Sequence, residues 1–142
     1  MSHQQSPLTL LSHEFISFRC EASRDKEADG ALALQTQCDI SRHAEDHSRW
    51  MIHLKVSFSA VEAEKPSPYT GEVAVEGLFQ VQDSFKTRHR EALIRVTASS
   101  MLYGACREML ANFTARSIHG ILSLPSISFR EKREKVVDQD AE

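Results

Sequence analysis

The side chains that could bind a metal ion are concentrated in one short polar segment, 41–48. In this segment His43 and His47 stand four residues apart beside Glu45 and Asp46. Two histidines at that spacing share one face of a helix and can ligate Zn²⁺. The segment lacks the apolar stripe that would hold a helix against a protein, and its composition is typical of a connection between strands. We therefore expect a solvated hairpin loop and no metal site.

The cysteines do not form a recognisable chemical motif. Cys20, Cys38 and Cys106 are an odd number of widely spaced residues, and each falls on the expected apolar face of its element. Disulfide frameworks and zinc clusters use paired or closely spaced cysteines. We expect three reduced cysteines that pack as small core residues.

No catalytic motif is present in the sequence. It contains no Gly-x-Ser-x-Gly and no glycine-rich phosphate loop, and the cysteines have no obvious histidine partner. Apolar residues make up 41% of the chain and charged residues 26%, which is typical of a soluble globular protein. We expect a binding protein that uses no cofactor, rather than an enzyme.

The charge and the apolar runs limit the possible partners. The formal net charge is −3, which argues against nucleic acid as a partner, because phosphate-backbone binding needs concentrated Lys and Arg. No apolar run approaches the roughly 18 residues of a membrane span, and residues 1–11 lack the features of a secretory signal. We expect a cytoplasmic protein without direct membrane insertion.

The basic segment 83–95 is expected to be a solvated lead-in to a helix.

Four stretches alternate apolar and polar residues with the period of a β-strand. They are residues 12–21, 31–40, 50–60 and 69–81. In the first stretch, Ile16, Phe18 and Cys20 are expected to face inward. In the last, Gly71 and Gly77 share one face and remove side chains where a helix or another chain approaches closely, or where the strand bulges.

One helix follows the strands, because apolar residues recur at its i, i+3, i+4 and i+7 positions. These residues are Ala98, Met101, Leu102, Ala105, Cys106, Met109, Leu110 and Phe113. The opposite side carries a line of small residues: Ser100, Gly104, Ala111 and Ala115. This line is either ordinary variation on a solvated face or the place where another subunit approaches, and both readings stay open.

The length of 142 residues favours a single domain. We expect a flexible N-terminus over residues 1–11, a folded domain over 12–129 and a charged tail over 130–142. The tail contains only Val136 and Val137 as apolar residues that could dock.

The order of four strands, a long helix, an apolar extended segment and a charged tail resembles the SecB family of protein-export chaperones. The resemblance covers about residues 12–129 and depends on an ordered set of short motifs. These are Phe15-Ile-Ser-Phe18, Tyr69-Thr-Gly-Glu-Val73, Gly77-Leu-Phe79, the helix segment 102–108 ending in Arg107-Glu108, Thr114-Ala-Arg116, and the extended segment 121–129.

The resemblance implies an α+β fold, in which one long helix packs on a four-stranded antiparallel sheet and a short C-terminal helix or tail follows. It also implies a homotetramer, arranged as a dimer of dimers with the long helices between the sheets. The implied activity is ATP-independent holding of unfolded preproteins and their delivery to the SecA motor.

The resemblance also implies site residues. The client-binding groove would use Tyr69, Ile118, Leu122, Leu124, Ile127 and Phe129, and Glu72 would face SecA. An extended client would gain affinity from apolar contact and main-chain pairing. Binding would lower the concentration of free unfolded chains by mass action and so oppose their folding and aggregation.

Other functions are compatible with the same fold. The chain could be a chaperone dedicated to one partner, such as the antitoxin of a toxin–antitoxin module, or an oligomeric adaptor without chaperone activity. Each groove residue could also be an ordinary core residue. We expect Leu124→Asp to weaken client binding with the oligomer intact if Leu124 lines a groove, and to disrupt the oligomer if Leu124 is core.

Overall fold

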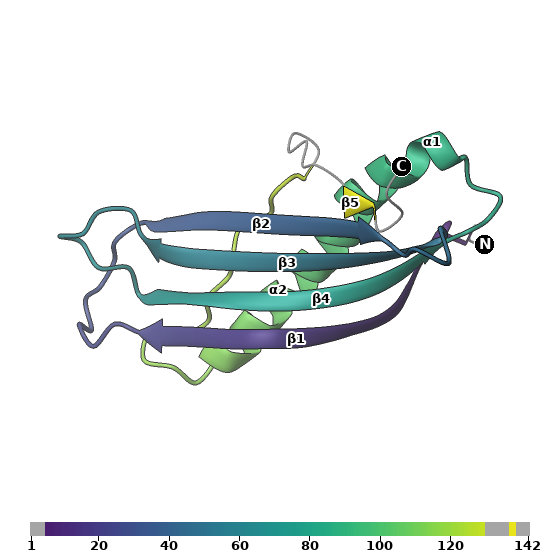
Figure 1. The fold of residues 1–142 in the computed structure, drawn as a ribbon. Helices are drawn as coiled ribbons and strands as arrows, with labels where there is room; N and C mark the ends of the chain where they lie inside the picture. Colours follow the sequence, from purple (N-terminus) through teal and green to yellow (C-terminus); the bar gives the residue numbers. More distant parts are fainter. Residues whose placement is uncertain (1–4, 130–136, 139–142) are drawn as a thin grey trace.

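The fold is a long antiparallel β-sheet with a helix across one of its faces (Figure 1). The structure is a computed structural model that describes residues 5–129 and 137–138. Its elements in chain order are β1 (Leu8–Ala22), β2 (Leu32–Arg42), β3 (Arg49–Ala60), β4 (Tyr69–Val81), α1 (Thr87–Leu93), the π-helical turn η1 (Ile94–Ala98), α2 (Ser99–Thr114) and β5 (Val137–Asp138). The predicted α+β fold with four main strands and one long helix is confirmed.

The order of strands in the sheet is β1-β4-β3-β2-β5. The pairs β1–β4, β4–β3 and β3–β2 are antiparallel, whereas the two-residue strand β5 runs parallel to the end of β2. Strands β1 and β2 are therefore the long outer strands of the sheet.

The core lies between the sheet and α2, which runs behind the sheet in Figure 1. In β3 the alternate residues from Trp50 to Phe58 are buried, as their strict alternation predicted. Leu102, Cys106 and Leu110 of α2 are fully buried against them. The apolar stripe predicted for the helix therefore covers this face of the sheet.

Two members of that stripe do not reach the core. Met101 and Phe113 are 42% and 52% exposed. Phe113 instead contacts Phe18 of β1 edge to face, with ring centroids 5.1 Å apart. Helical periodicity therefore marks a wider apolar stripe than the sheet covers. Side chains at the borders of the stripe do not point at the sheet and stay exposed.

The prediction for the first strand was wrong in two respects. Strand β1 begins at Leu8, so residues 8–11 belong to the sheet rather than to a flexible terminus. The pairing with β4 also shifts at Leu11 and at Ile16, each of which is an extra residue in β1. Such β-bulges reset which residues face inward. Phe15 consequently packs against the core, while Ile16 is 51% exposed.

The helical region begins earlier than predicted. Residues Thr87–Leu93 of the basic lead-in form α1, none of whose residues is buried. Arg90 stabilises this turn by donating to the backbone oxygens of Asp83 and Phe85, at 3.1 and 3.3 Å. The segment is solvated as expected, and from Thr87 onward it is itself helical.

The two strand glycines lie at close approaches, as predicted. A Cβ on Gly71 would stand 2.0 Å from the backbone oxygen of Arg19 on β1. A Cβ on Gly77 would stand 2.8 Å from the Leu102 side chain of α2. The close neighbours are therefore the adjacent strand and the helix of the same chain.

The reactive side chains adopt structural roles. The three cysteines are free, with Cys38 and Cys106 buried. Burial raises the pKa of the Cys106 thiol to about 12, which keeps it protonated and unreactive. The predicted hairpin loop between β2 and β3 is confirmed, and the ring of His43 accepts backbone N–H bonds from Glu45 and Asp46 within it.

Candidate functional site

The segment that follows α2 connects the two long edges of the sheet. Figure 1 shows it rising from the end of α2, near β1, to the edge formed by β2. Residues 115–129 of this crossover segment contain no strand, so side chains must hold them in place. The contacts of the crossover segment decide which of its apolar residues remain accessible.

The start of the crossover segment is held by Tyr69. Its hydroxyl donates to the backbone oxygen of Gly120 at 2.6 Å, and its ring packs edge to face on His119. The His119 Nε2 lies 2.7 Å from the backbone oxygen of Ser23, and must therefore donate a proton to it. Gly120 has a φ of 75°, which glycine adopts without strain. This corner is consequently fixed on β4 and on the β1–β2 connection.

The far half of the crossover segment is held by α2. The Tyr103 hydroxyl donates to the backbone oxygen of Pro125 at 2.5 Å, and its ring packs edge to face on Phe129. Burial raises the pKa of Tyr103, which keeps its hydroxyl protonated as this bond requires. Leu124 is 1% exposed and belongs to the core together with Phe129.

The six residues predicted for the client groove therefore fall into two sets. Tyr69, Leu124 and Phe129 are buried in the protomer. Tyr69 anchors the crossover segment on β4, and Leu124 and Phe129 pack the segment on the core. Their accessible surface is too small for direct contact with a client in this conformation. The other three keep accessible surface: Leu122 and Ile127 are partly buried, and Ile118 is 51% exposed. A groove role for these three stays a prediction.

A hollow of about 410 Å³ opens where the crossover segment meets β2. It is lined by Leu34, Gln35, Thr36, Ile127 and Ser128. The sequence analysis included Ile127 among the groove residues but not Leu34, which it placed only within the expected strand 31–40. The apolar residues of an edge strand could have signalled such a site only if the strand order had been known.

The backbone of β2 beside this hollow faces outward at alternate residues. The backbone N–H of His43 donates to the backbone oxygen of Arg49 at 2.9 Å. The backbone N–H and C=O groups of the odd-numbered residues of β2 therefore point toward β3. The even-numbered residues, including Leu32, Leu34 and Ile40, therefore aim their N–H and C=O groups at the outer edge. Strand β5 pairs with this outer side of β2 at Ser41 and Arg42. We call the hollow between the crossover segment and β2, with its apolar residues Leu34 and Ile127, the β2 edge site.

The face of the sheet away from α2 is polar and carries ion pairs. Glu72, predicted to face SecA, lies 3.6 Å from Lys55 and accepts a hydrogen bond from Ser57. The imidazole of His53 lies 3.2 Å from Glu76 on the same face. Glu72 is thus on the sheet surface as its strand position required, and its role toward SecA stays a prediction.

The small residues of α2 lie on the side away from the sheet. Ser100, Gly104 and Ala115 are exposed and Ala111 is partly buried. A Cβ added at Gly104 would meet nothing within 4 Å. The protomer leaves this face open to solvent or to another subunit, so the predicted oligomer interface remains a prediction.

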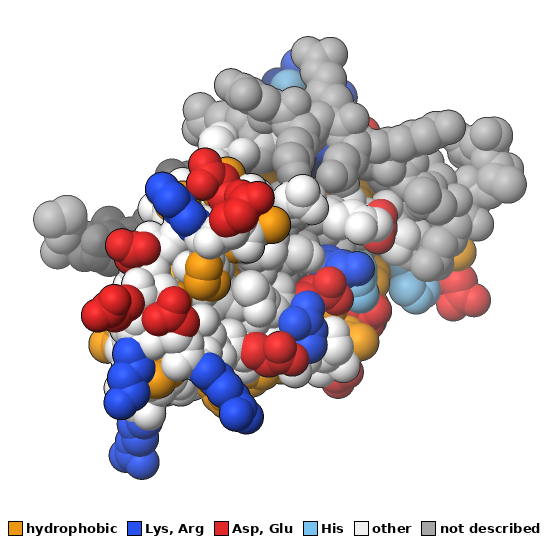
Figure 2. All heavy atoms as spheres, turned by 90° about the vertical axis from the view of Figure 1, so that its left-hand side faces the viewer, with side chains coloured by type: hydrophobic (Ala, Val, Ile, Leu, Met, Phe, Trp, Pro, Cys, Tyr) orange, Lys and Arg blue, Asp and Glu red, His pale blue; other side chains and the backbone are white. Residues whose placement is uncertain are grey.

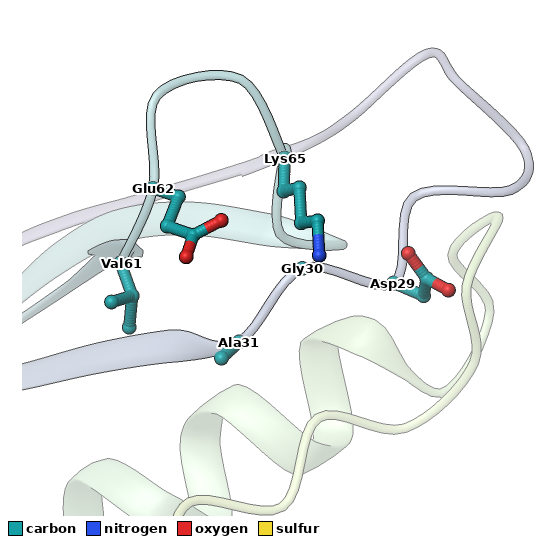
Figure 3. Close-up of a pocket in the computed structure, with 6 residues that line it drawn as sticks. All are labelled: Asp29, Gly30, Ala31, Val61, Glu62 and Lys65. Atoms are coloured by element: carbon teal, nitrogen blue, oxygen red, sulfur yellow. The ribbon is translucent and has the colours of Figure 1, made fainter.

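A second hollow, of about 220 Å³, lies between the loops at the end of the sheet where β2 begins (Figure 3). It is lined by Asp29, Gly30, Ala31, Val61, Glu62 and Lys65. Figure 2 shows that acidic and basic side chains are interspersed over this end of the molecule. Two carboxylates and one ammonium give no strong preference for an anion or a cation, so this hollow is a weaker candidate than the β2 edge site.

Comparison with known proteins supports the fold assignment alone. No protein-family model matches the chain, and no curated protein matches it. Among solved structures, it is similar to a SecB-like chaperone of Mycobacterium tuberculosis in complex with a ChAD peptide from an antitoxin. That match has a TM-score of 0.65 and 13% identity, and covers 86% of this chain and 91% of that one. The SecB-like architecture expected from the sequence is therefore present.

A second solved structure is a protein of unknown function from Streptococcus agalactiae. It has a TM-score of 0.49 and 9% identity, and the match covers 84% of this chain and 97% of that one.

Within the described residues, no helix is long and apolar enough to cross a membrane.

Proposed function

We propose that this chain is an ATP-independent holdase that binds unfolded polypeptide segments in an extended conformation. The observation that carries the proposal is the β2 edge site, a hollow to which Leu34 of β2 and Ile127 of the crossover segment both contribute apolar side chains. The SecB-like fold and the peptide bound by its Mycobacterium tuberculosis neighbour support the same kind of ligand.

The β2 edge site suits clients of many sequences. An extended segment in the hollow would place every second side chain against Leu34 and Ile127, which favours apolar clients. Apolar contact does not require one particular sequence. Unfolded chains expose apolar segments that folded proteins bury, so the site would select unfolded chains.

The accessible apolar residues of the crossover segment extend this surface. Ile118 and Ile121 are 51% and 63% exposed on the turn that follows α2. Leu122 is partly buried between them and the core. We propose that Ile118, Leu122 and Ile127 contact the client directly, whereas Tyr69, Leu124 and Phe129 hold the crossover segment in place.

Delivery of preproteins to SecA in the cytoplasm is the more specific part of the proposal. It would use the sheet surface around Glu72, which lies on the face opposite α2. Assembly as a homotetramer would use the face of α2 that carries Ser100, Gly104 and Ala115. On this arrangement the SecA contact, the subunit contact and the β2 edge site occupy three separate surfaces.

A chaperone dedicated to a single partner is the second candidate function. The observation that favours it is the antitoxin peptide in the structural neighbour. The two candidates differ in breadth, because a general holdase suppresses the aggregation of several unrelated unfolded proteins. A dedicated chaperone suppresses that of one, and an adaptor without chaperone activity suppresses none.

The test is the light-scattering mass of the purified protein, alone and with chemically unfolded proteins added. We expect a mass near four subunits that rises in proportion to the bound client. Ile127→Glu should weaken client binding by roughly tenfold, because the new carboxylate would have to be desolvated when a client covers the hollow. Met51→Glu is the matched control, since Met51 is exposed on the opposite face of the sheet. A protein that binds no unfolded client at all would refute the holdase.

The SecA contact needs a separate test. Glu72→Lys should weaken binding to SecA while leaving the affinity for unfolded clients unchanged, because Glu72 lies on the face away from the β2 edge site. Unchanged SecA binding, or no SecA binding by either protein, would refute the export role and leave the holdase in place.

A further inference from the structure

The last residue of α2, Thr114, links the helix to the crossover segment through a buried hydroxyl. Its Oγ1 donates to the backbone oxygen of Leu110 at 2.6 Å and accepts the backbone N–H of Leu122 at 2.8 Å. Among side chains of this size, only a hydroxyl can make both bonds with one atom, because it carries a donor and free lone pairs together. A single buried atom therefore ties the end of the helix to the crossover segment.

The bond from Leu122 closes a compact loop, residues 114–122, which we call the corner loop. Inside it, the N–H of Ser117 donates to the backbone oxygen of Thr114 at 2.9 Å, and the N–H of Gly120 donates to that of Ser117 at 3.0 Å. Compact surface loops whose ends lie close together hold a defined shape and frequently carry function. The corner loop has such a shape because its two ends are bonded to each other.

The amide of Leu122 depends on the hydroxyl of Thr114. Residues 115–129 contain no strand, so no neighbouring strand offers a carbonyl to this N–H. Leu122 is partly buried against the core. A buried amide that loses its acceptor costs free energy, which would move this part of the chain toward water. The hydroxyl of Thr114 therefore determines where the backbone of Leu122 lies.

The corner loop presents apolar side chains to solvent. Ile118 and Ile121 are exposed within it, next to the partly buried Leu122. An unrestrained loop would turn such side chains toward the protein, because that removes apolar area from water. The bonds that close the loop oppose this collapse and keep the isoleucines accessible.

We propose that Thr114 is a positioning residue of the client site, which holds Leu122 and the exposed isoleucines in their binding arrangement before a client arrives. This inference rests on the proposed holdase function and names a residue that acts on the site without touching the client. A preorganised loop loses less conformational freedom on binding than a loose one, so it binds the client more tightly.

The first test compares two variants of the full chain. Thr114→Val has a similar shape but no hydroxyl, so the Leu122 N–H loses its acceptor. Thr114→Ser is the matched control, because it keeps the hydroxyl and loses a buried methyl group. The probe is fluorescently labelled carboxymethylated α-lactalbumin, which is permanently unfolded. We expect Thr114→Val to bind it roughly three- to tenfold more weakly than the natural chain, and Thr114→Ser to bind it within about twofold.

Urea unfolding of the same proteins separates positioning from stability. Both variants should be less stable than the natural chain, Thr114→Ser through the lost methyl group and Thr114→Val through the unpaired amide. Binding that weakens in both variants in proportion to the lost stability would overturn the positioning role. Equal, measurable affinity of all three proteins would also overturn it and leave the holdase standing. Absence of binding by all three would overturn the holdase and, with it, the positioning role.

A second measurement uses the natural chain alone and serves even if Thr114→Val does not fold. Hydrogen exchange at the Leu122 amide should be slow before the unfolded probe is added, because the bond to Thr114 is already formed. Fast exchange in the free protein, whether or not the probe slows it, would overturn the preorganisation of the corner loop.

Discussion

Replacing Leu124 by alanine would decide whether the crossover segment is packed as the structure describes. Leu124 is 1% exposed and belongs to the core cluster with Leu102 and Leu110. A buried Leu→Ala change costs about 2–5 kcal/mol, because transfer energy is lost and a cavity remains. We expect the free energy of unfolding to fall by about 3 kcal/mol. In a domain of this size the midpoint of thermal unfolding should drop by roughly 10 °C.

The assay is urea unfolding followed by circular dichroism, with Ile121→Ala as the matched control. Ile121 lies three residues earlier in the same segment but is 63% exposed. Its truncation should change the free energy of unfolding by less than about 0.5 kcal/mol. The two variants remove similar apolar groups, so their difference measures burial rather than chemistry.

Equal stability of the two variants would refute the packing of Leu124. Leu124 would then be accessible, and Leu124→Asp would weaken client binding with the oligomer intact, as a groove residue should. The structure leads to the other outcome. A carboxylate at this buried position should destabilise the whole fold, so the loss of binding would accompany a loss of the folded protein.

Four further predictions concern positions outside the crossover segment or at its anchor. Gly71→Ala should destabilise the fold by about 1–3 kcal/mol, because its Cβ would meet the backbone of β1. In contrast, Gly104→Ala should stabilise the protein by about 1 kcal/mol in urea unfolding, since the added methyl group has open space in a helix. A lower light-scattering mass for that variant would instead reveal a tight subunit contact at Gly104. Tyr69→Phe should cost about 0.5–1.5 kcal/mol by removing the hydrogen bond to the crossover segment, and no change would mean that this bond is absent in solution. Burial raises the pKa of Cys106 from 9.0 to about 12, so its contribution to stability is present below pH 9 and is lost as the pH rises toward 12. Cys106→Ala should reduce this alkaline slope, and an unaltered slope would assign it to other groups.

Local periodicity was sufficient where the backbone repeats without interruption. Strand β3 alternates strictly from Trp50 to Phe58, and α2 repeats its apolar residues with helical spacing. In both cases the side-chain direction follows from the backbone geometry, so the buried face could be predicted. The same reasoning failed in β1, because each bulge adds a residue and shifts the later side chains. Ile16 was predicted as inward and is exposed, while Phe15 takes the inward place.

The candidate site was predictable only as a segment. The apolar character of residues 121–129 marked the crossover segment, but not which of its side chains are accessible. Leu124 is buried and Ile121 is exposed, although their residue types are nearly equivalent. Leu34 joined the site only because β2 is an outer strand and Ile127 returns beside it.

The sequence by itself determined the α+β class, the four main strands, the long helix and the absence of a recognisable catalytic motif. These properties depend on periodicities and residue types within about ten to fifteen residues. Only the tertiary structure decided which strands are edges, which crossover residues are buried, and that β5 pairs with β2. Such properties depend on contacts between residues far apart in the chain, such as Ser41 and Val137. No local pattern encodes the strand order that brings those residues together.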